Sequence, residues 1–123
     1  MIETRLEEDF LGQLAIPADA LYGIQSVRAS QNFPDSSRFN LEWYKAMGAV
    51  KLACYQTCHK YYEALKSSLS SSEIPFRIIE EEKLKAMEQA AIEIMDGKWF
   101  DQFIVPATQG GAGTSINMNI NEI

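Results

Sequence analysis

The chain has 123 residues, which is enough for one domain with a modest hydrophobic core. Its formal net charge is -6, from 17 acidic and 11 basic side chains, so a nucleic acid is not an expected partner. No apolar run approaches the roughly 20 residues of a membrane span, and the first residues show no secretory signal, so we expect no membrane association.

The first segment with a pattern covers residues 4–16. Apolar residues alternate weakly with polar ones along it, and Gly12 marks a turn near its middle. This pattern indicates either a short β-hairpin or an extended arm, which Pro17 would close.

A short helix is predicted from Ala20 to Phe33, with Asp19 as its N-cap and Pro34 as its stop. Gln25 and Arg28 lie three residues apart and would share one face of this helix. Two interpretations of the pair remain open at this point. The two side chains could face an anion, or they could belong to a solvated polar face.

Two longer amphipathic helices are predicted next. Apolar spacings of three and four predict a helix over residues 41–66, capped by Asn40. Its predicted apolar stripe consists of Leu41, Tyr44, Met47, Val50, Cys54, Cys58, Tyr61 and Leu65. A serine-rich connector over residues 67–72 leads to a second helix that would begin at Pro75 and end at Gly97. Two such helices would form a small antiparallel all-α unit.

The helix over residues 41–66 carries both cysteines and the only histidine. Cys54 and Cys58 lie four residues apart, which is poor geometry for a disulfide and too few ligands for zinc. His59 is expected to be an ordinary residue on the surface of the helix. We therefore expect no metal site and no cofactor.

The most unusual run lies near the end of the chain. Three glycines between positions 110 and 113 are followed directly by Thr114 and Ser115, and apolar residues return from Ile116. Thr114 and Ser115 are residue types that often serve as helix N-caps. This order predicts a bare loop that leads into a helix N-terminus, whose N–H groups and dipole suit an anion. A carboxylate fits better than a phosphate, because the lysine of a Walker loop and the third glycine of a dinucleotide fingerprint are missing. A turn that only reverses the chain remains an alternative.

The order of residues also resembles a known family. Residues 109–122 read QGGAGTSINMNINE, which resembles the first substrate-loop motif of the aspartase/fumarase superfamily. Residues 5–9, 17–34 and 97–105 resemble the runs that precede this loop in the aspartase branch. Residues 21–24 read LYGI where fumarases more often read YWGA, and Ala112 stands where fumarases have serine, so the aspartase branch is favoured.

The resemblance implies a mainly α fold over residues 1–123, the N-terminal helical domain of the aspartase/fumarase fold. It would contain two long amphipathic helices, shorter ones and a possible β-hairpin, without the central helical bundle and the C-terminal domain. The resemblance further implies an enzyme that reversibly eliminates ammonia from L-aspartate to give fumarate, as a cytoplasmic homotetramer without a cofactor. A class II fumarase and a non-enzymatic helical domain that binds carboxylates or acts as a scaffold remain alternatives.

The resemblance also implies a set of site residues. The residues that it places at the substrate are Thr114, Gly113, Ala112 and Asn117. The residue pattern itself adds Ser115, Arg28 and Gln25 as further candidates. Asn119, Asn121 and Glu122 are expected to cap, pack or otherwise serve structure. The catalytic serine of the family lies in a Gly-Ser-Ser-x-Met-Pro motif that the chain does not contain, so the chain alone is expected to be inactive. Because the sequence ends at Ile123 within a helical pattern, it is expected to be a truncated piece.

Overall fold

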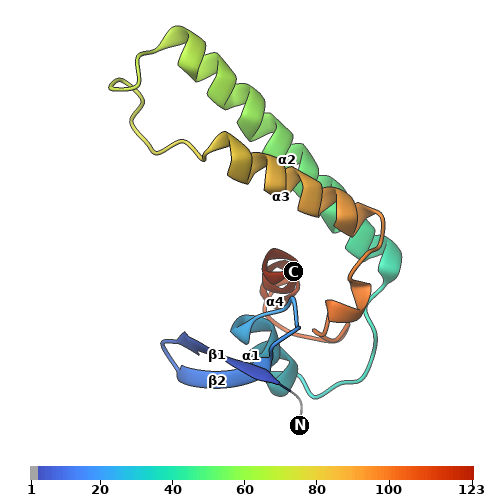
Figure 1. Cartoon of the computed structure of the whole chain (residues 1–123). Coiled ribbons are helices and arrows are strands. Elements are labelled where there is room, and N and C mark those ends of the chain that lie inside the picture. The colour runs from blue at the N-terminus through green and yellow to red at the C-terminus, as the bar shows by residue number, and fades with distance from the viewer. Residues whose placement is uncertain (1–2) are drawn as a thin grey trace. The chain divides into compact units, whose positions relative to one another are not determined.

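A computed structural model describes residues 3–123, which fold into two compact units (Figure 1). The first unit comprises the residues up to Trp43 together with Trp99–Ile123, and the second comprises Tyr44–Lys98. The expected mainly α fold with an N-terminal hairpin is confirmed. None of the helices in the described part of the chain combines the length and the apolar character needed to cross a membrane.

The first unit begins with an antiparallel hairpin of β1 (Thr4–Asp9) and β2 (Gly12–Pro17). Gly12 has φ 107°, a left-handed conformation that glycine adopts without strain. The Leu11 amide donates to the Asp9 side chain at 2.8 Å and closes the turn. Of the two interpretations of this segment, the structure therefore selects the hairpin over the extended arm.

Helix α1 (Ile24–Asn32) begins later than the sequence predicts, and its N-cap is Gly23 in place of Asp19. The physical reason is the Arg5 side chain, which binds the carbonyl of Ala20 at 2.6 Å and that of Tyr22 at 2.9 Å. In a helix that began at Ala20, these two carbonyls would accept hydrogen bonds from amides of the next turn. The segment before Gly23 is therefore held in an irregular conformation by a residue of β1.

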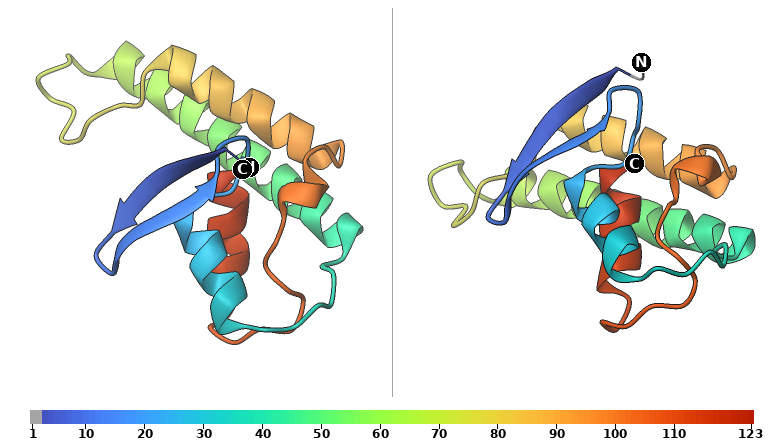
Figure 2. Two further views of the ribbon diagram at one scale, coloured as in Figure 1. Left: turned by 60° about the horizontal axis from the view of Figure 1, so that its bottom comes forward. Right: turned by 90° about the horizontal axis from the view of Figure 1, so that it is seen from below.

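Helix α4 (Thr114–Glu122) packs beside α1 in the first unit (Figure 2). The core there includes Ile16 and Ile120, which are almost completely buried. Asn119 is also fully buried, and its side-chain oxygen accepts the N–H groups of Ile104 at 2.9 Å and Val105 at 3.2 Å. Asn119 therefore fastens α4 to the segment that follows the short 3-10 helix η1 (Phe100–Gln102).

The second unit consists mainly of α2 (Leu41–Ser68) and α3 (Glu81–Met95), which run side by side (Figures 1 and 2). The predicted cap of α2 is confirmed, because the Trp43 amide donates to the Asn40 side chain at 3.1 Å. Gly48 lets the two helices approach closely. A Cβ atom added there would lie only 2.7 Å from the Met95 backbone nitrogen.

The predicted apolar stripe of α2 is only partly right. Tyr44 is buried, but Val50 is 62% exposed and Tyr61 is 52% exposed. The face that packs includes Gly48 and the part-buried Lys51, whose pKa is lowered chiefly by its burial. A periodicity count of apolar residues overlooks both residue types, so it finds Tyr44, Met47, Cys58 and Leu65 on the packed side but also includes exposed residues such as Val50 and Tyr61.

Helix α3 begins at Glu81, six residues after the predicted start at Pro75. Its first turn contains the acidic residues Glu81 and Glu82, which are stabilised there by the helix dipole. The predicted end is confirmed: Gly97 has φ 79°, and its amide binds the Ile94 carbonyl at 2.9 Å.

The cysteines and the histidine all lie on α2. Cys54 and Cys58 are both free thiols. The prediction of an ordinary surface histidine is incomplete, because His59 lies 3.3 Å from the Glu88 carboxylate of α3 and 3.8 Å from that of Glu63. Within residues 3–123 no group of three or more potential ligands is arranged to hold a metal ion.

Candidate functional site

The glycine loop before α4 is the candidate site, and the predicted order of loop and helix is confirmed. Gly111, Ala112 and Gly113 all adopt the left-handed conformation, with φ values of 85°, 55° and 84°. For the alanine this conformation costs about 1–2 kcal/mol. Residues 110–112 are exposed, so the loop is an open surface and is not packed into the core. Strained backbone of this kind is frequent at ligand sites.

The helix start differs from the expectation in one respect. The N-cap is Gly113, and no side chain caps the helix, so Thr114 and Ser115 are its first two helical residues. Both the amide and the hydroxyl of Thr114 donate to the Gly111 carbonyl, at 3.1 Å and 2.9 Å. The threonine therefore closes the loop upon itself and leaves its hydroxyl at the surface.

Donors remain available at the start of α4. The Asn117 amide binds the Gly113 carbonyl at 3.0 Å, as expected for the first helical hydrogen bond. Among the described residues no hydrogen bond uses the amides of Ser115 and Ile116, which belong to the first turn. Two backbone N–H groups, the exposed Thr114 side chain and the positive end of the helix dipole thus meet at one place. Such a place can bind an anion.

Ser115 and Asn117 lie on the same helix, α4, where Ser115 is half-buried and Asn117 is exposed. Together with Ala112, Gly113 and Thr114 they form one continuous segment. Five of the seven residues that the sequence singles out are therefore brought together by local chain geometry alone.

Arg28 has a different environment. Its guanidinium binds both oxygens of Asp9, at 2.7 Å and 2.9 Å, and the Gly12 carbonyl at 2.9 Å. Its side chain is 22% exposed and that of Asp9 is 9% exposed. The hydrogen bond from Arg28 is the main reason that the pKa of Asp9 lies below its ordinary value of 3.8, and partial desolvation opposes it. Arg28 therefore joins α1 to the hairpin.

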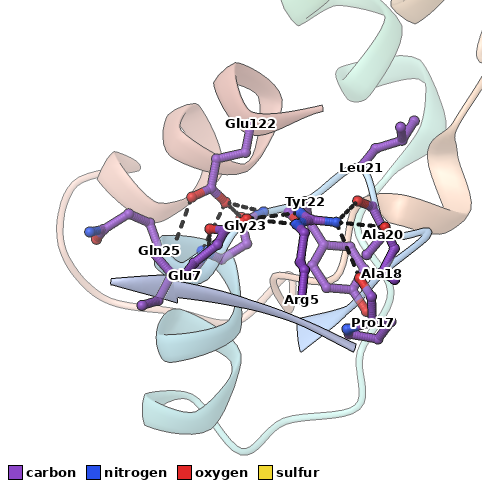
Figure 3. Close-up of polar contacts among 12 residues, drawn as sticks. Arg5, Glu7, Pro17, Ala18, Ala20, Leu21, Tyr22, Gly23, Gln25 and Glu122 are labelled. Carbon is purple, nitrogen blue, oxygen red and sulfur yellow. Dashed lines mark hydrogen bonds and ion pairs between the residues drawn. The ribbon is translucent and has the colours of Figure 1, made fainter. Parts of the chain in front are cut away.

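The N-terminus of α1 holds two carboxylates of the chain itself, and Figure 3 shows this arrangement. The Glu122 carboxylate accepts the amides of Gly23, Gln25 and Ser26, each at 3.0 Å. Glu7 accepts the Ile24 amide at 2.8 Å. The expected structural role of Glu122 is confirmed, as is that of the buried Asn119.

Sequence reasoning missed the partners at this helix end. Glu122 and its three amide partners lie 96 to 99 residues apart in the chain, and no periodicity or motif spacing connects them. Gly23 is the residue in the sequence that could have indicated this close approach. A Cβ atom there would lie 2.8 Å from a Glu122 oxygen and 3.0 Å from a Glu7 oxygen, so a side chain at this position would displace these carboxylates.

Comparison with known proteins gives a consistent result. Residues 12–123 match a protein-family model described as lyase. Aspartate ammonia-lyase of Bacillus subtilis (strain 168) is 43% identical over 122 residues, which cover 98% of this chain and 22% of that protein. Class II fumarate hydratase of Thermus thermophilus is 38% identical, over 99% of this chain and 24% of that protein.

A solved structure described as fumarate lyase:delta crystallin from Brucella melitensis superposes with a TM-score of 0.79 at 36% identity. The superposition covers 98% of this chain and 24% of that one. The chain thus spans about a quarter of the length of the relatives it matches.

Proposed function

Because this chain belongs to the lyase family whose model covers residues 12–123, we propose that it is the N-terminal part of an aspartate ammonia-lyase. Such an enzyme reversibly eliminates ammonia from L-aspartate to give fumarate. The proposal is supported by 42% and 43% identity to two Bacillus aspartate ammonia-lyases over 98% of the chain. The observation that carries it is the exposed loop at the start of α4, where no hydrogen bond of the described residues uses the amides of Ser115 and Ile116.

The chemistry explains why such a loop is needed. Elimination removes a proton from the carbon beside the β-carboxylate, and that carboxylate then gains negative charge. Donors that are already oriented stabilise this charge without reorganisation in the transition state. We assign this task to the Ser115 and Ile116 amides and to the Thr114 hydroxyl, which can turn from the Gly111 carbonyl toward a substrate oxygen.

Gly113 and Ala112 would let the substrate approach the backbone, and Asn117 would contact it from the next turn of α4. Arg28 and Gln25 would support the site from α1. Since Arg28 already binds Asp9, its contribution would be to hold the hairpin and α1 together.

The proton-removing base is proposed to lie outside residues 1–123, which would make this chain inactive alone. We further propose that the whole enzyme works as a cytoplasmic homotetramer. Residues 1–123 would then be a single N-terminal domain within it, although the structure divides into two compact units.

A class II fumarase is the second candidate, since the Thermus thermophilus hydratase is 38% identical to this chain. Ala112 separates the two proposals, because the fumarases have serine at the corresponding position of the motif. A non-enzymatic carboxylate-binding or scaffold domain is the alternative of another class.

An absorbance assay for fumarate decides among these functions. The whole protein that carries this chain is supplied with L-aspartate in one reaction and with L-malate in another. Fumarate from aspartate is the expected result, and fumarate only from malate identifies a hydratase. Failure with both substrates contradicts the enzymatic proposal, and turnover by residues 1–123 alone contradicts the placement of the base.

A further inference from the structure

We infer that Glu122 is a positioning residue for the glycine loop. Its carboxylate fastens the end of α4 to the N-terminus of α1, and the loop at the opposite end of α4 is thereby held in place. The inference deepens the proposed function and rests on it only for the identity of the ligand.

Both oxygens of the Glu122 carboxylate accept hydrogen bonds. Its two oxygens accept three backbone N–H groups, each at 3.0 Å, and also the hydroxyl of Ser26. Ser26 is completely buried. A carboxylate at a helix N-terminus is favoured by both the dipole and the unpaired amides, and hydrogen bonds to a charged acceptor are the stronger ones.

The receiving end of this contact is held by several hydrogen bonds. The Arg5 side chain binds the Glu7 carboxylate at 2.9 Å together with the carbonyls of residues 17, 18, 20 and 22, and Glu7 binds the first amide of α1 (Figure 3). Gly23 leaves no spare space, since a Cβ atom there would approach Glu122 to 2.8 Å. The Glu122 carboxylate is therefore surrounded by donors that other contacts of the first unit hold in place.

Helix α4 connects Glu122 at its C-terminal end to the glycine loop at its N-terminal end. Eight residues separate Glu122 from Thr114, which corresponds to about 12 Å along a helix axis. Midway, the buried Asn119 side chain binds the amides of Ile104 and Val105 and so fixes how α4 is rotated. Residues 110–112 are exposed, so the loop buries little surface of its own beyond the bonds of Thr114 to the Gly111 carbonyl. The orientation of Thr114 thus depends on contacts made further along the helix.

The first test measures turnover in the whole protein with Glu122→Gln, which keeps the shape but replaces one acceptor oxygen by a donor group. We expect kcat/KM for L-aspartate to fall roughly tenfold to a hundredfold, mainly through kcat, because misplaced donors act in the transition state. Glu122→Asp keeps the charge and is expected to recover part of the loss. Glu8→Gln, on the exposed side of β1, is the matched control and is expected to change nothing.

The second test needs no substrate. Hydrogen exchange of the Thr114 and Asn117 amides is compared between the wild type and Glu122→Gln. We expect exchange to become roughly tenfold faster at both amides, because their hydrogen bonds to the loop open more often. If Glu122→Gln does not fold, Ser26→Ala takes its place, because it removes only one of the four donors to Glu122. It is expected to give a smaller increase in exchange at the same two amides.

Faster exchange at residues 23–26 with unchanged exchange at Thr114 and Asn117 would overturn the inference, because Glu122 would then stabilise α1 alone. An equal loss of activity in Glu122→Asp and Glu122→Gln would also count against it. If the wild-type protein forms no fumarate, the proposed function fails, and the exchange measurement still decides the role of Glu122.

Discussion

At the scale of single residues, the glycines of the loop before α4 differ in what they require. Gly111 and Gly113 have φ values of 85° and 84°, whereas Gly110 has no positive φ. A Cβ atom on Gly113 would meet no atom within 4 Å, and one on Gly110 would lie 3.9 Å from a Phe33 ring carbon. The backbone conformation alone therefore separates the two positions.

Gly113→Ala is expected to lower the free energy of unfolding by about 1 kcal/mol, because alanine is strained at positive φ. Gly110→Ala is the matched control and is expected to raise it by about 0.4–1 kcal/mol by restricting the unfolded chain. Urea denaturation of both variants measures the difference. Equal effects would show that the loop does not hold the left-handed conformation.

The ion pair of Asp9 and Arg28 predicts a pH effect. The pKa of Asp9 in the folded chain lies below 3.8, its ordinary value, mainly because of the Arg28 hydrogen bond. A lowered carboxyl pKa contributes stability above the unfolded pKa, and this contribution is lost as the pH falls through the folded pKa.

We therefore expect the difference in unfolding free energy between the wild type and Asp9→Asn to be constant near neutral pH and to shrink below about pH 4. Arg28→Gln removes the cation that lowers the pKa of Asp9. The difference in unfolding free energy between the wild type and Arg28→Gln is therefore expected to shrink over the same pH range. Urea denaturation at a series of pH values is the measurement. A difference that stays constant down to pH values well below the ordinary Asp pKa would contradict this assignment.

Local signals predicted several residues correctly, and distant partners were beyond their reach. Asn40 and Gly97 act within a few residues of their own helices, so their capping roles could be predicted from the sequence. Arg28 and Glu122 bind partners on other elements. Which of their possible partners they meet is decided by tertiary structure, and a single sequence carries no record of it.

At the scale of elements, the crossing of α2 and α3 depends on Gly48. A Cβ atom there would lie 2.7 Å from the Met95 nitrogen and 2.9 Å from the Ala91 carbonyl oxygen. Both neighbours are backbone atoms, which cannot move aside without shifting α3. The close approach is therefore a property of this glycine and not of the apolar stripe.

Helix propensity alone predicts that Gly48→Ala stabilises the chain by about 1 kcal/mol. We expect the opposite, a net loss of about 1–3 kcal/mol, because the added methyl group overpacks the contact. Ala49→Gly at the neighbouring exposed position calibrates the propensity effect in the same helix. Thermal or urea unfolding provides the values, and a stabilised Gly48→Ala variant would refute the close contact.

The starts of α1 and α3 show where element prediction failed. In both cases the predicted helix began about one turn or more too early, at Ala20 and at Pro75. The start of α1 is set by Arg5, Glu7 and Glu122, all from other elements. The long helix α2 was predicted well because its periodicity extends over many turns.

At the scale of the whole molecule, the hairpin and helices of the first unit carry the exposed donor loop before α4. The loop and the start of α4 could be predicted from their residue order, because glycines and hydroxyl residues act locally. The arrangement that holds α4 in position could not, because it depends on contacts between β1, α1 and α4. The relatives are about four times as long as this chain, and the proposed function places the proton-removing base outside residues 1–123.

We propose above that the donors around Thr114 stabilise the charge that builds on a substrate carboxylate. The most direct measurement is kcat/KM for L-aspartate in the whole protein carrying Thr114→Ala. Thr114→Ser keeps the hydroxyl, and Thr57→Ala removes a hydroxyl that binds the Ala53 carbonyl at 2.7 Å on α2.

We expect Thr114→Ala to lower kcat/KM by roughly a hundredfold to a thousandfold, as for the loss of one donor to a developing oxyanion. Thr114→Ser is expected to recover most of this loss, and Thr57→Ala is expected to match the wild type. If Thr114→Ala retains wild-type kcat/KM, the loop does not bind the reacting carboxylate and the account is wrong.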